Sequence, residues 1–371
     1  MKPLDHTYQT LYSELAQRAL DAAFTSDFSI EGRFVTQESN GRRYWYFDTA
    51  KSEGGKHRRY VGPVDDPEVN SRVEAFKDLK ADYRARRKLV STLIREAYLP
   101  RPEPYVGDVI QTLAEAGFFR LRGVLIGTVA YQAYAAILGV RLANTAMHTG
   151  DLDVAQFHSI SAAVGDAMPP VLDILRGVDQ TFREIPHAAD GRQTTSYISR
   201  SGFRVEFLTP NTGSDDHQDQ PARMPALGGA SAQPLRFLDF LIHEPVRVVL
   251  LHGAGVPVLV PAPERYAVHK LIVGSRRRDD NDGTTKSQKD RLQAKTLMEA
   301  MIELRRNVDL AEAYVEAWDR GPAWREAIER SLISFDEATR EEIALGLAVG
   351  IERLELAAKD YGLPGSVRPR K

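Results

Sequence analysis

One stretch of this chain constrains its fold more than any other: an apolar segment, a glycine turn, a helix-forming run and then two aspartates. The apolar segment at residues 124–128 ends in Gly127-Thr128, and helix-forming residues follow at 129–138. Asp151-Leu152-Asp153 comes next, and alternate side chains of a strand share one face. The pattern predicts a strand, a tight turn into a helix, and a second strand whose two carboxylates point the same way.

Two carboxylates held side by side repel each other unless a cation neutralises them. Hard oxygen ligands of this kind suit Mg²⁺ or Mn²⁺. At the Gly127-Thr128 turn, the first N–H groups of the helix offer a place for a phosphate, and glycine lets the backbone approach it closely. Most isolated Asp-x-Asp pairs are solvated turns, so it is the upstream strand and turn that favour a site for metal-bound polyphosphate.

Composition limits the classes of protein to which the chain can belong. Of 371 residues, 43% are hydrophobic and 27% are charged, which is typical of a globular protein with a large core. The net charge of −2 favours neither nucleic acid nor membrane binding by the chain as a whole. The absence of cysteine excludes disulfides, zinc–thiolate sites and thiol nucleophiles. The sequence has no signal-peptide core and no apolar run of membrane-spanning length, so we expect a cytoplasmic protein without a membrane partner.

The N-terminal part of the chain predicts a basic module. Between residues 32 and 63, aromatic and β-branched runs alternate with Asn-Gly and Gly-Gly turns, which indicates successive β-hairpins. A basic helix is expected from about residue 66 to 98, ended by prolines at 100, 102 and 104. The hairpins could grip RNA or DNA, or their aromatic residues could fill a small core while the arginines face water. The residues concerned are Arg42, Arg43, Tyr44, Trp45, Tyr46, Lys56, Arg58, Arg59 and Tyr60.

The rest of the chain alternates strand and helix patterns. Strands are expected at 194–199, 203–208, 246–251 and 256–260, and helices at 1–23, 109–117 and 161–176. Residues 211–234 are rich in Gly, Pro, Asp, Gln and Ala, which predicts a surface loop. The predicted fold is α+β: a hairpin and helix module at 1–104, a core of mixed β-sheet flanked by helices at 105–262, and a helical C-terminal domain at 263–371.

With its apolar strand, Gly-Thr turn, helix and Asp-x-Asp, the chain resembles the DNA polymerase β-like nucleotidyltransferase superfamily over about residues 123–270. Within it, the chain is similar to a bacterial branch with toxin-like members of the AbiEii and MenA kind. The resemblance implies that Asp151 and Asp153 bind the metal and that a third carboxylate comes from a neighbouring strand. Glu206 is the candidate, a lone acid in an apolar strand, although an outward-facing residue or a partner of Arg204 would give the same pattern.

The resemblance also implies a set of phosphate-binding residues. Gly127 and Thr128 match the turn that receives the phosphates, and Lys270 matches a helix lysine directed at the triphosphate. Lys289 and Asp290 match a later Lys-Asp pair that follows an arginine-rich turn. Taken alone, a lysine on a helix is most often a solvent-facing charge.

The function implied by the resemblance is Mg²⁺- or Mn²⁺-dependent transfer of a nucleoside monophosphate from an NTP to a hydroxyl, with pyrophosphate leaving. The acceptor is open: RNA such as tRNA bound by the N-terminal module, a protein side chain or a small molecule. A toxin-like member would have an antitoxin protein as its partner. Two other functions stay open, a nucleotidyltransferase-fold protein that binds or regulates without catalysis, and a nucleic-acid-binding module without chemistry. The pair Asp151 and Asp153 favours the enzyme, because a site without metal gains nothing from adjacent carboxylates.

Overall fold

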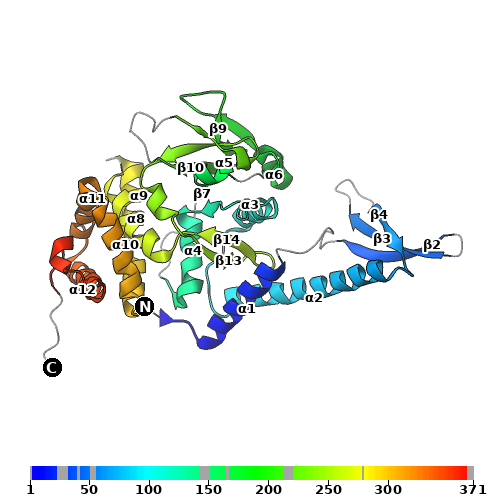
Figure 1. Cartoon of the computed structure of the whole chain (residues 1–371), viewed down its shortest axis with the longest axis horizontal. Helices are drawn as coiled ribbons and strands as arrows, with labels where there is room; N and C mark the ends of the chain where they lie inside the picture. The colour runs from blue at the N-terminus through cyan, green and yellow to red at the C-terminus, as the bar shows by residue number, and fades with distance from the viewer. Residues whose placement is uncertain are drawn as a thin grey trace.

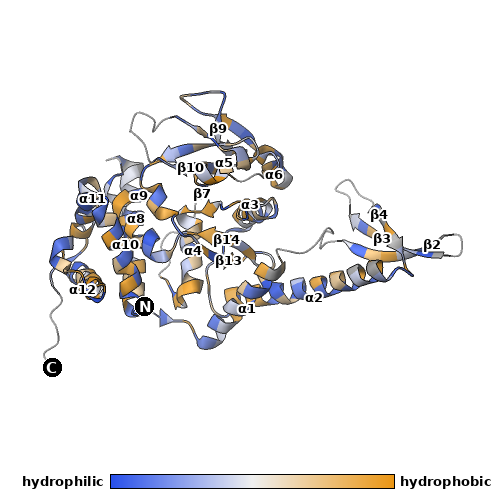
Figure 2. Ribbon diagram, in the orientation of Figure 1, coloured by the Kyte–Doolittle hydropathy of each residue, from blue (hydrophilic) through white to orange (hydrophobic). Residues whose placement is uncertain are grey.

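The computed structural model describes residues 2–22, 32–39, 42–50, 56–142, 150–163, 167–211, 220–277 and 280–365 (Figure 1). A mixed β-sheet lies in the body of the molecule with helices packed around it, and a long helix carries a small second sheet away from the body. Apolar residues lie throughout the body and also on the strands of the small second sheet (Figure 2). Within the described ranges, no helix combines the length and the apolar character needed to cross a membrane.

The central sheet contains seven of the described strands, in the order β11-β12-β10-β7-β5, with β8 and β9 branching from β10. β10 runs parallel to both β7 and β12, whereas β5 and β9 are antiparallel to their neighbours, so the predicted mixed sheet is confirmed. The strands are β5 (Val124–Leu125), β7 (Asp151–Ala155), β8 (Arg183–Pro186), β9 (Thr194–Ile198), β10 (Arg204–Pro210), β11 (Ala222–Arg223) and β12 (Ser231–Leu235).

Strand β10 changes partner along its length. Its first half pairs with β9 as far as Glu206, and its second half pairs with β12 from Leu208 onward. Val205 and Phe207 are buried on one face of this strand, where the ring of Phe207 meets the rings of Phe118 and Tyr197. Glu206 lies on the other face, since successive side chains of a strand alternate.

Short helices and a hairpin complete the middle of the chain. The helices α3 and α4 follow the predicted pattern, and α3 begins on Pro104, whose fixed φ suits the first helical turn. The predicted strands at 246–251 and 256–260 form one antiparallel hairpin. The elements are α3 (Pro104–Glu115), α4 (Gly127–Leu138), α5 (His158–Ala163), α6 (Val171–Val178), η2 (Pro225–Leu227), α7 (Leu238–Leu241), β13 (Val246–Leu250) and β14 (Val256–Val260).

The C-terminal part is helical, as predicted. The side chains of Asp280 and Asp336 cap α9 and α12 by accepting hydrogen bonds from the backbone N–H groups of Gly283 and Thr339. The helices are α8 (Pro263–Ser275), α9 (Asn281–Glu303), α10 (Asn307–Asp319), α11 (Pro322–Ile333), α12 (Glu337–Arg353) and η3 (Ala358–Tyr361). Their buried residues belong to the same hydrophobic cluster as those of the central sheet.

The N-terminal segment is fastened to the body at two points. Strand β1 (Lys2–Pro3) pairs with β6 (Val140–Arg141), and α1 (His6–Ala22) packs on the β13–β14 hairpin. The hydroxyl of Tyr12 is 3.1 Å from both the backbone oxygen and the backbone nitrogen of Val249. These bonds join the start of the chain to a hairpin 237 residues later.

Beyond α1, the chain forms an arm, which we define as β2 (Arg33–Ser39), β3 (Arg42–Ala50), β4 (Lys56–Pro63) and the part of α2 (Pro67–Arg95) packed on them (Figure 1). The three strands form an antiparallel sheet, which confirms the predicted hairpins; their turns lie outside the described residues. The rings of Phe34, Phe47 and Phe76 meet edge to face, with centroids 4.9 to 5.5 Å apart. Of the two alternatives for the hairpins, a small aromatic core therefore forms, although it is built mainly from phenylalanines.

Two predictions about the middle of the chain are wrong. The helix expected at 161–176 is two helices, α5 and α6, because Pro169 and Pro170 break the pattern between them. The loop expected at 211–234 contains β11, η2 and β12 in its described part, and residues 212–219 lie outside the description. The domain boundaries at 104/105 and 262/263 stay predictions, and the hydrophobic cluster of the body continues across both.

Candidate active site

Strand register brings the three predicted carboxylates together. In the parallel pair β7–β10, Asp151 lies opposite Arg204 and Asp153 lies opposite Glu206. Residues opposite each other in a sheet share a face, and so do residues two apart along one strand. Asp151, Asp153 and Glu206 therefore line one face, and the predicted position of Glu206 beside the aspartates is confirmed.

The crowding of these carboxylates changes the acidity of Asp153. Burial first, and then the charges of Asp151 and Glu206, raise the pKa of Asp153 to about 7. Lys270 and Arg277 act in the opposite direction but do not restore the ordinary value of 3.8. A cation placed among the three carboxylates would relieve this repulsion.

Glycine is required at the turn before α4. Gly127 has φ +69°, a conformation that residues with a side chain rarely adopt. A Cβ at this position would stand 2.7 Å from the Oδ2 atom of Asp153. The backbone N–H of Ile126 also donates to the carbonyl of Asp153 at 3.0 Å, so the turn and the aspartate strand are fixed against each other.

A lysine from the C-terminal helices reaches this turn. The Nζ of Lys289, on α9, donates to the Oγ1 of Thr128 at 2.8 Å. No side chain caps the N-terminus of α4, which has twelve residues. Burial first, and then the nearby Lys270, lower the pKa of Lys289, whereas Asp151, Asp290 and Asp153 raise it. Thr128 and Lys289, each predicted separately to bind phosphate, thus form one polar group beside the carboxylates.

Lys270, the other predicted phosphate ligand, is held by an acid from the neighbouring helix. Its Nζ lies 2.5 Å from the Oδ1 of Asp290, and the Nε of Arg277 lies 2.9 Å from the other carboxylate oxygen. Burial opposes the charge of Asp290, but Lys270 and Arg277 keep its pKa below the usual value. Asp290 therefore orients two cations of the site. Sequence reasoning missed Arg277, whose one signal was its place in the arginine-rich turn.

Two further residues complete the surroundings. Arg204 donates to Glu206 at 3.1 Å, so the pairing left open as an alternative for Glu206 does form. Both side chains are partly exposed, and the same Glu206 faces the aspartates, so the pairing and the predicted position coexist. His269 is buried, and burial lowers its pKa to about 3, so it is neutral and structural.

A hollow of about 150 Å³ lies at the point where β10 changes partner. It is bordered by Glu206, and its other lining residues are Thr195, Ser196, Phe207, Leu208 and Gln233. The imidazole of His187 orients Gln233: its Nδ1 accepts from the backbone N–H of Ala189, so the neutral ring donates from Nε2 to the Oε1 of Gln233, 2.6 Å away. The hollow thus joins a carboxylate to hydroxyl and amide groups.

The carboxylates are chemically suited to a divalent cation, although they do not form a complete coordination shell. Three carboxylates on one face are the oxygen donors that Mg²⁺ and Mn²⁺ prefer. Among the described residues, no three His, Cys, Asp or Glu side chains lie close enough to hold a metal without moving. Mg²⁺ commonly takes only one or two carboxylates and completes its shell with water and substrate phosphates, so the residues present fit the ion.

The sheet thus carries paired aspartates on one face, beside a glycine turn and the uncapped N-terminus of a helix, an arrangement that suits a phosphate. A family model described as "Nucleotidyltransferase" matches residues 105–319, more than half of the chain. The chain belongs to this nucleotidyltransferase family. Its match begins at α3, includes the site just described, and ends with α10. Searches of curated proteins and of solved structures find no match to this chain.

Proposed function

We propose that this protein transfers a nucleoside monophosphate from an NTP to a hydroxyl, using Mg²⁺ or Mn²⁺. The observation that carries the proposal is the register of β7 and β10, which sets Asp151, Asp153 and Glu206 on one face beside the Gly127 turn. The membership in the nucleotidyltransferase family supports it. The resemblance to toxin-like members, with an antitoxin protein as partner, stays a prediction.

Each part of the site has a role in this reaction. Asp151, Asp153 and Glu206 would hold the metal, which when bound supplies charge neutralisation for the phosphates. The hydroxyl of Thr128 and the ammonium of Lys289 bind phosphate oxygens at the start of α4. Lys270, held by Asp290, adds positive charge for the leaving pyrophosphate.

The transfer exchanges one P–O bond for another. The acceptor oxygen forms a bond to the α-phosphorus while the bond between this phosphorus and the bridging oxygen breaks. Pyrophosphate leaves with the bonding electrons, and the acceptor proton passes to the carboxylate of Glu206. The hollow at Glu206 gives the acceptor hydroxyl a place within reach of that carboxylate.

The experiment is incubation of the purified protein with each α-labelled ribonucleoside triphosphate, Mg²⁺, and either total RNA or total protein. We expect a labelled acceptor and released pyrophosphate, both lost on chelation of the metal. Asp153→Asn should lose transfer, because it removes a carboxylate at the centre of the cluster. Glu74→Gln, on the exposed side of α2, is the matched control. Equal labelling by the wild type and Asp153→Asn would sink the proposal and favour a fold that binds without catalysis.

A further inference from the structure

A basic stripe runs along the solvent side of α2 where this helix approaches the body. We define the stripe as the exposed cations Arg84, Arg87, Lys88 and Arg95. None of the four forms an ion pair or a side-chain hydrogen bond with the described part of the chain. Arg84 repels Arg87 and Lys88, three and four residues further on, and like charges at these spacings destabilise a helix. No internal interaction of the four side chains offsets this repulsion within the described residues.

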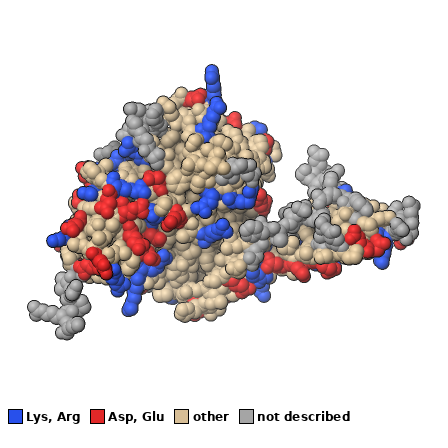
Figure 3. Space-filling model, viewed as in Figure 1, with Lys and Arg blue, Asp and Glu red and all other residues tan. Residues whose placement is uncertain are grey.

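Two acidic residues of α2 lie on another side of the helix. At 100° per residue, Asp78 and Asp82 are turned by about 120° and 160° from Arg84, and Glu74, turned by about 80°, lies ten residues before it. Asp82 also pairs with Arg18 and Arg86, within the body. In Figure 3 the side of α2 that faces the viewer carries acidic side chains along its length. The stripe is therefore a local positive surface on a chain that is almost neutral overall.

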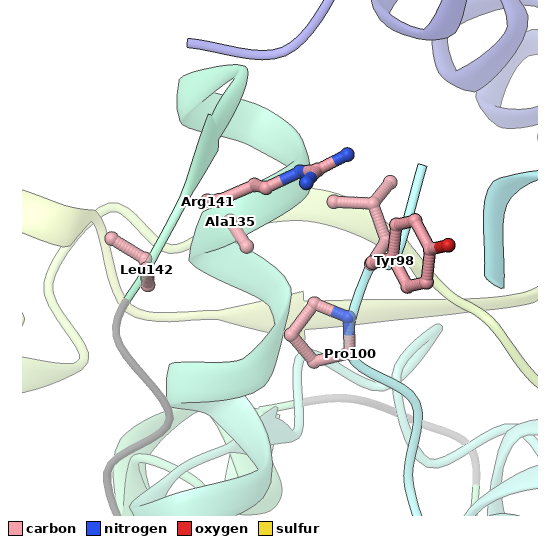
Figure 4. Close-up of a pocket in the computed structure, with 6 residues that line it drawn as sticks. Tyr98, Pro100, Ala135, Arg141 and Leu142 are labelled. Atoms are coloured by element: carbon pink, nitrogen blue, oxygen red, sulfur yellow. The ribbon is translucent and has the colours of Figure 1, made fainter. Parts of the chain in front are cut away.

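An exposed aromatic ring lies just past the end of this stripe. Tyr98 is 70% exposed, three residues after Arg95, and the guanidinium of Arg141 lies 5.0 Å from the centre of its ring. Figure 4 shows the two side chains directed at each other beside Pro100, at a hollow of about 200 Å³ that Leu142 also lines. One face of the ring is thus held by a cation while the ring as a whole stays open to solvent.

The backbone at Tyr98 offers a way to remove the ring without disturbing the turn. The turn after α2, closed by the bond from the N–H of Leu99 to the carbonyl of Leu93, places Tyr98 at φ +56°. Arg305 after α9 and Glu355 after α12 also have positive φ, so several helices of this chain end in this conformation. Glycine adopts it freely, so Tyr98 can be replaced by glycine while the turn is kept.

We infer that the basic stripe and Tyr98 bind RNA, with an unpaired base stacked on the Tyr98 ring and the backbone phosphates along Arg84, Arg87, Lys88 and Arg95. A cationic track next to a stacking aromatic is the chemistry that single-stranded nucleic acid requires. An anionic membrane would need a free apolar face beside the charges, but Val90 and Leu93 of α2 are buried in the body.

This inference names the acceptor class of the proposed nucleotide transfer, and it moves the binding surface away from the hairpins. Arg58 of β4 is already paired with the buried Asp48 and donates to Gln37, so this hairpin arginine is neutralised within the arm. RNA binding is measured without NTP, so its failure and a failure of nucleotide transfer are distinguishable.

The probe for the test is a fluorescein-labelled RNA hairpin with a single-stranded 3′ tail, followed by fluorescence anisotropy. Tyr98→Gly removes the ring and places glycine at a positive φ, so the fold should keep its thermal stability or gain some. We expect this variant to bind the tailed RNA about 5- to 100-fold more weakly, and Tyr98→Phe to bind it normally. A loss of the same size in both variants would overturn the stacking role.

The stripe is tested by reversing Arg84 and Lys88 to Glu, matched by reversing the exposed Arg353 and Lys359 at the other end of the molecule. The first pair should lower the RNA affinity and flatten its log–log salt dependence by about 0.7 for each phosphate that the protein no longer neutralises. The second pair should change neither. Three results would each overturn the assignment. The two double variants could change RNA binding equally, the protein could bind a blunt RNA hairpin as tightly as the tailed one, or it could bind the same tailed probe made of DNA equally well.

Discussion

Asp153 is the residue at which burial and two neighbouring carboxylates all oppose ionisation. Its Oδ2 atom also faces Gly127 and occupies the space that a side chain at this position would need. Ionisation of Asp153 therefore destabilises the metal-free protein. The cation of the proposed reaction would offset this cost.

Asp153 predicts how stability depends on pH. Its folded pKa of about 7 exceeds the ordinary 3.8, so the folded state holds this proton more tightly than the unfolded chain does. Stability from this group is complete below pH 4 and is lost as the pH rises through 7, with an upper bound of about 4 kcal/mol at about 1.4 kcal/mol per pKa unit.

Asp153→Asn has no such group and should be more stable than the wild type at pH 8 in a chelator, and about equal to it near pH 4. Urea unfolding at both pH values measures this difference. Mg²⁺ should then stabilise the wild type at pH 8 and leave the variant almost unchanged. Parallel pH profiles for the two proteins would contradict the prediction.

Gly127 gives a second prediction at this scale. Gly127→Ala places a Cβ against the Asp153 carboxylate and forces a side chain into positive φ, which costs about 1–2 kcal/mol before any clash is counted. We expect a lower midpoint of thermal unfolding and loss of nucleotide transfer. Gly150→Ala is the control, because a Cβ at Gly150 meets no atom within 4 Å. Equal stability of the two variants would show that the turn yields without cost.

The sequence predicted the carboxylates of the site but not the contacts among the residues around them. Asp151, Asp153 and Glu206 could be placed because a period of two residues fixes the face of a strand. The bonds from Lys289 to Thr128 and from Arg277 to Asp290 depend on how α8 and α9 pack against the sheet. Nothing in the local sequence fixes that packing, so those partners became known only from the structure.

At the scale of elements, α8 and α9 are joined at the site by one buried acid. Asp290 on α9 binds both Lys270 on α8 and Arg277 just beyond it. Breaking a buried ion pair leaves charges without a partner and is more costly than removing the whole pair. Asp290 thus links the two helices at the site.

We therefore expect Asp290→Asn to destabilise the protein by about 3 kcal/mol, because Lys270 and Arg277 keep their charges. Glu74→Gln breaks the pair between Glu74 and Lys77, whose side chains are 67% and 61% exposed, and should cost less than about 1 kcal/mol. Guanidinium unfolding of both variants gives the comparison. Similar losses would mean that the buried pair is no stronger than a surface pair.

Helices and strands can be predicted from the sequence where their signals are local. The arm strands and the β13–β14 hairpin follow from turn residues between β-forming runs, because these signals are local. β12 was missed because its sequence, Ser-Ala-Gln-Pro-Leu, has little β propensity. It forms a strand because β10 offers an edge for parallel pairing at Leu208, a long-range contact that composition does not reveal.

At the scale of the whole molecule, the arm and the body have separate hydrophobic cores. Phe47, Val73 and Phe76 are buried in the arm but do not belong to the large cluster of the body. α2 is shared, since its C-terminal half contributes Val90 and Leu93 to the body cluster. We therefore expect the arm sheet to open while the body, with the candidate active site, stays folded.

Phe47→Ala tests this separation. The substitution removes one ring of the arm core and should cost about 3–5 kcal/mol, enough to unfold a small sheet of three strands. Hydrogen exchange should show faster exchange in β2, β3 and β4 and unchanged protection in β7 and β10. Phe207→Ala, in the body core next to Glu206, is the counterpart and should lower protection throughout the central sheet. If Phe47→Ala also lowered protection in β7, the arm and the body would be one cooperative unit, and damage to the arm would reach the carboxylates.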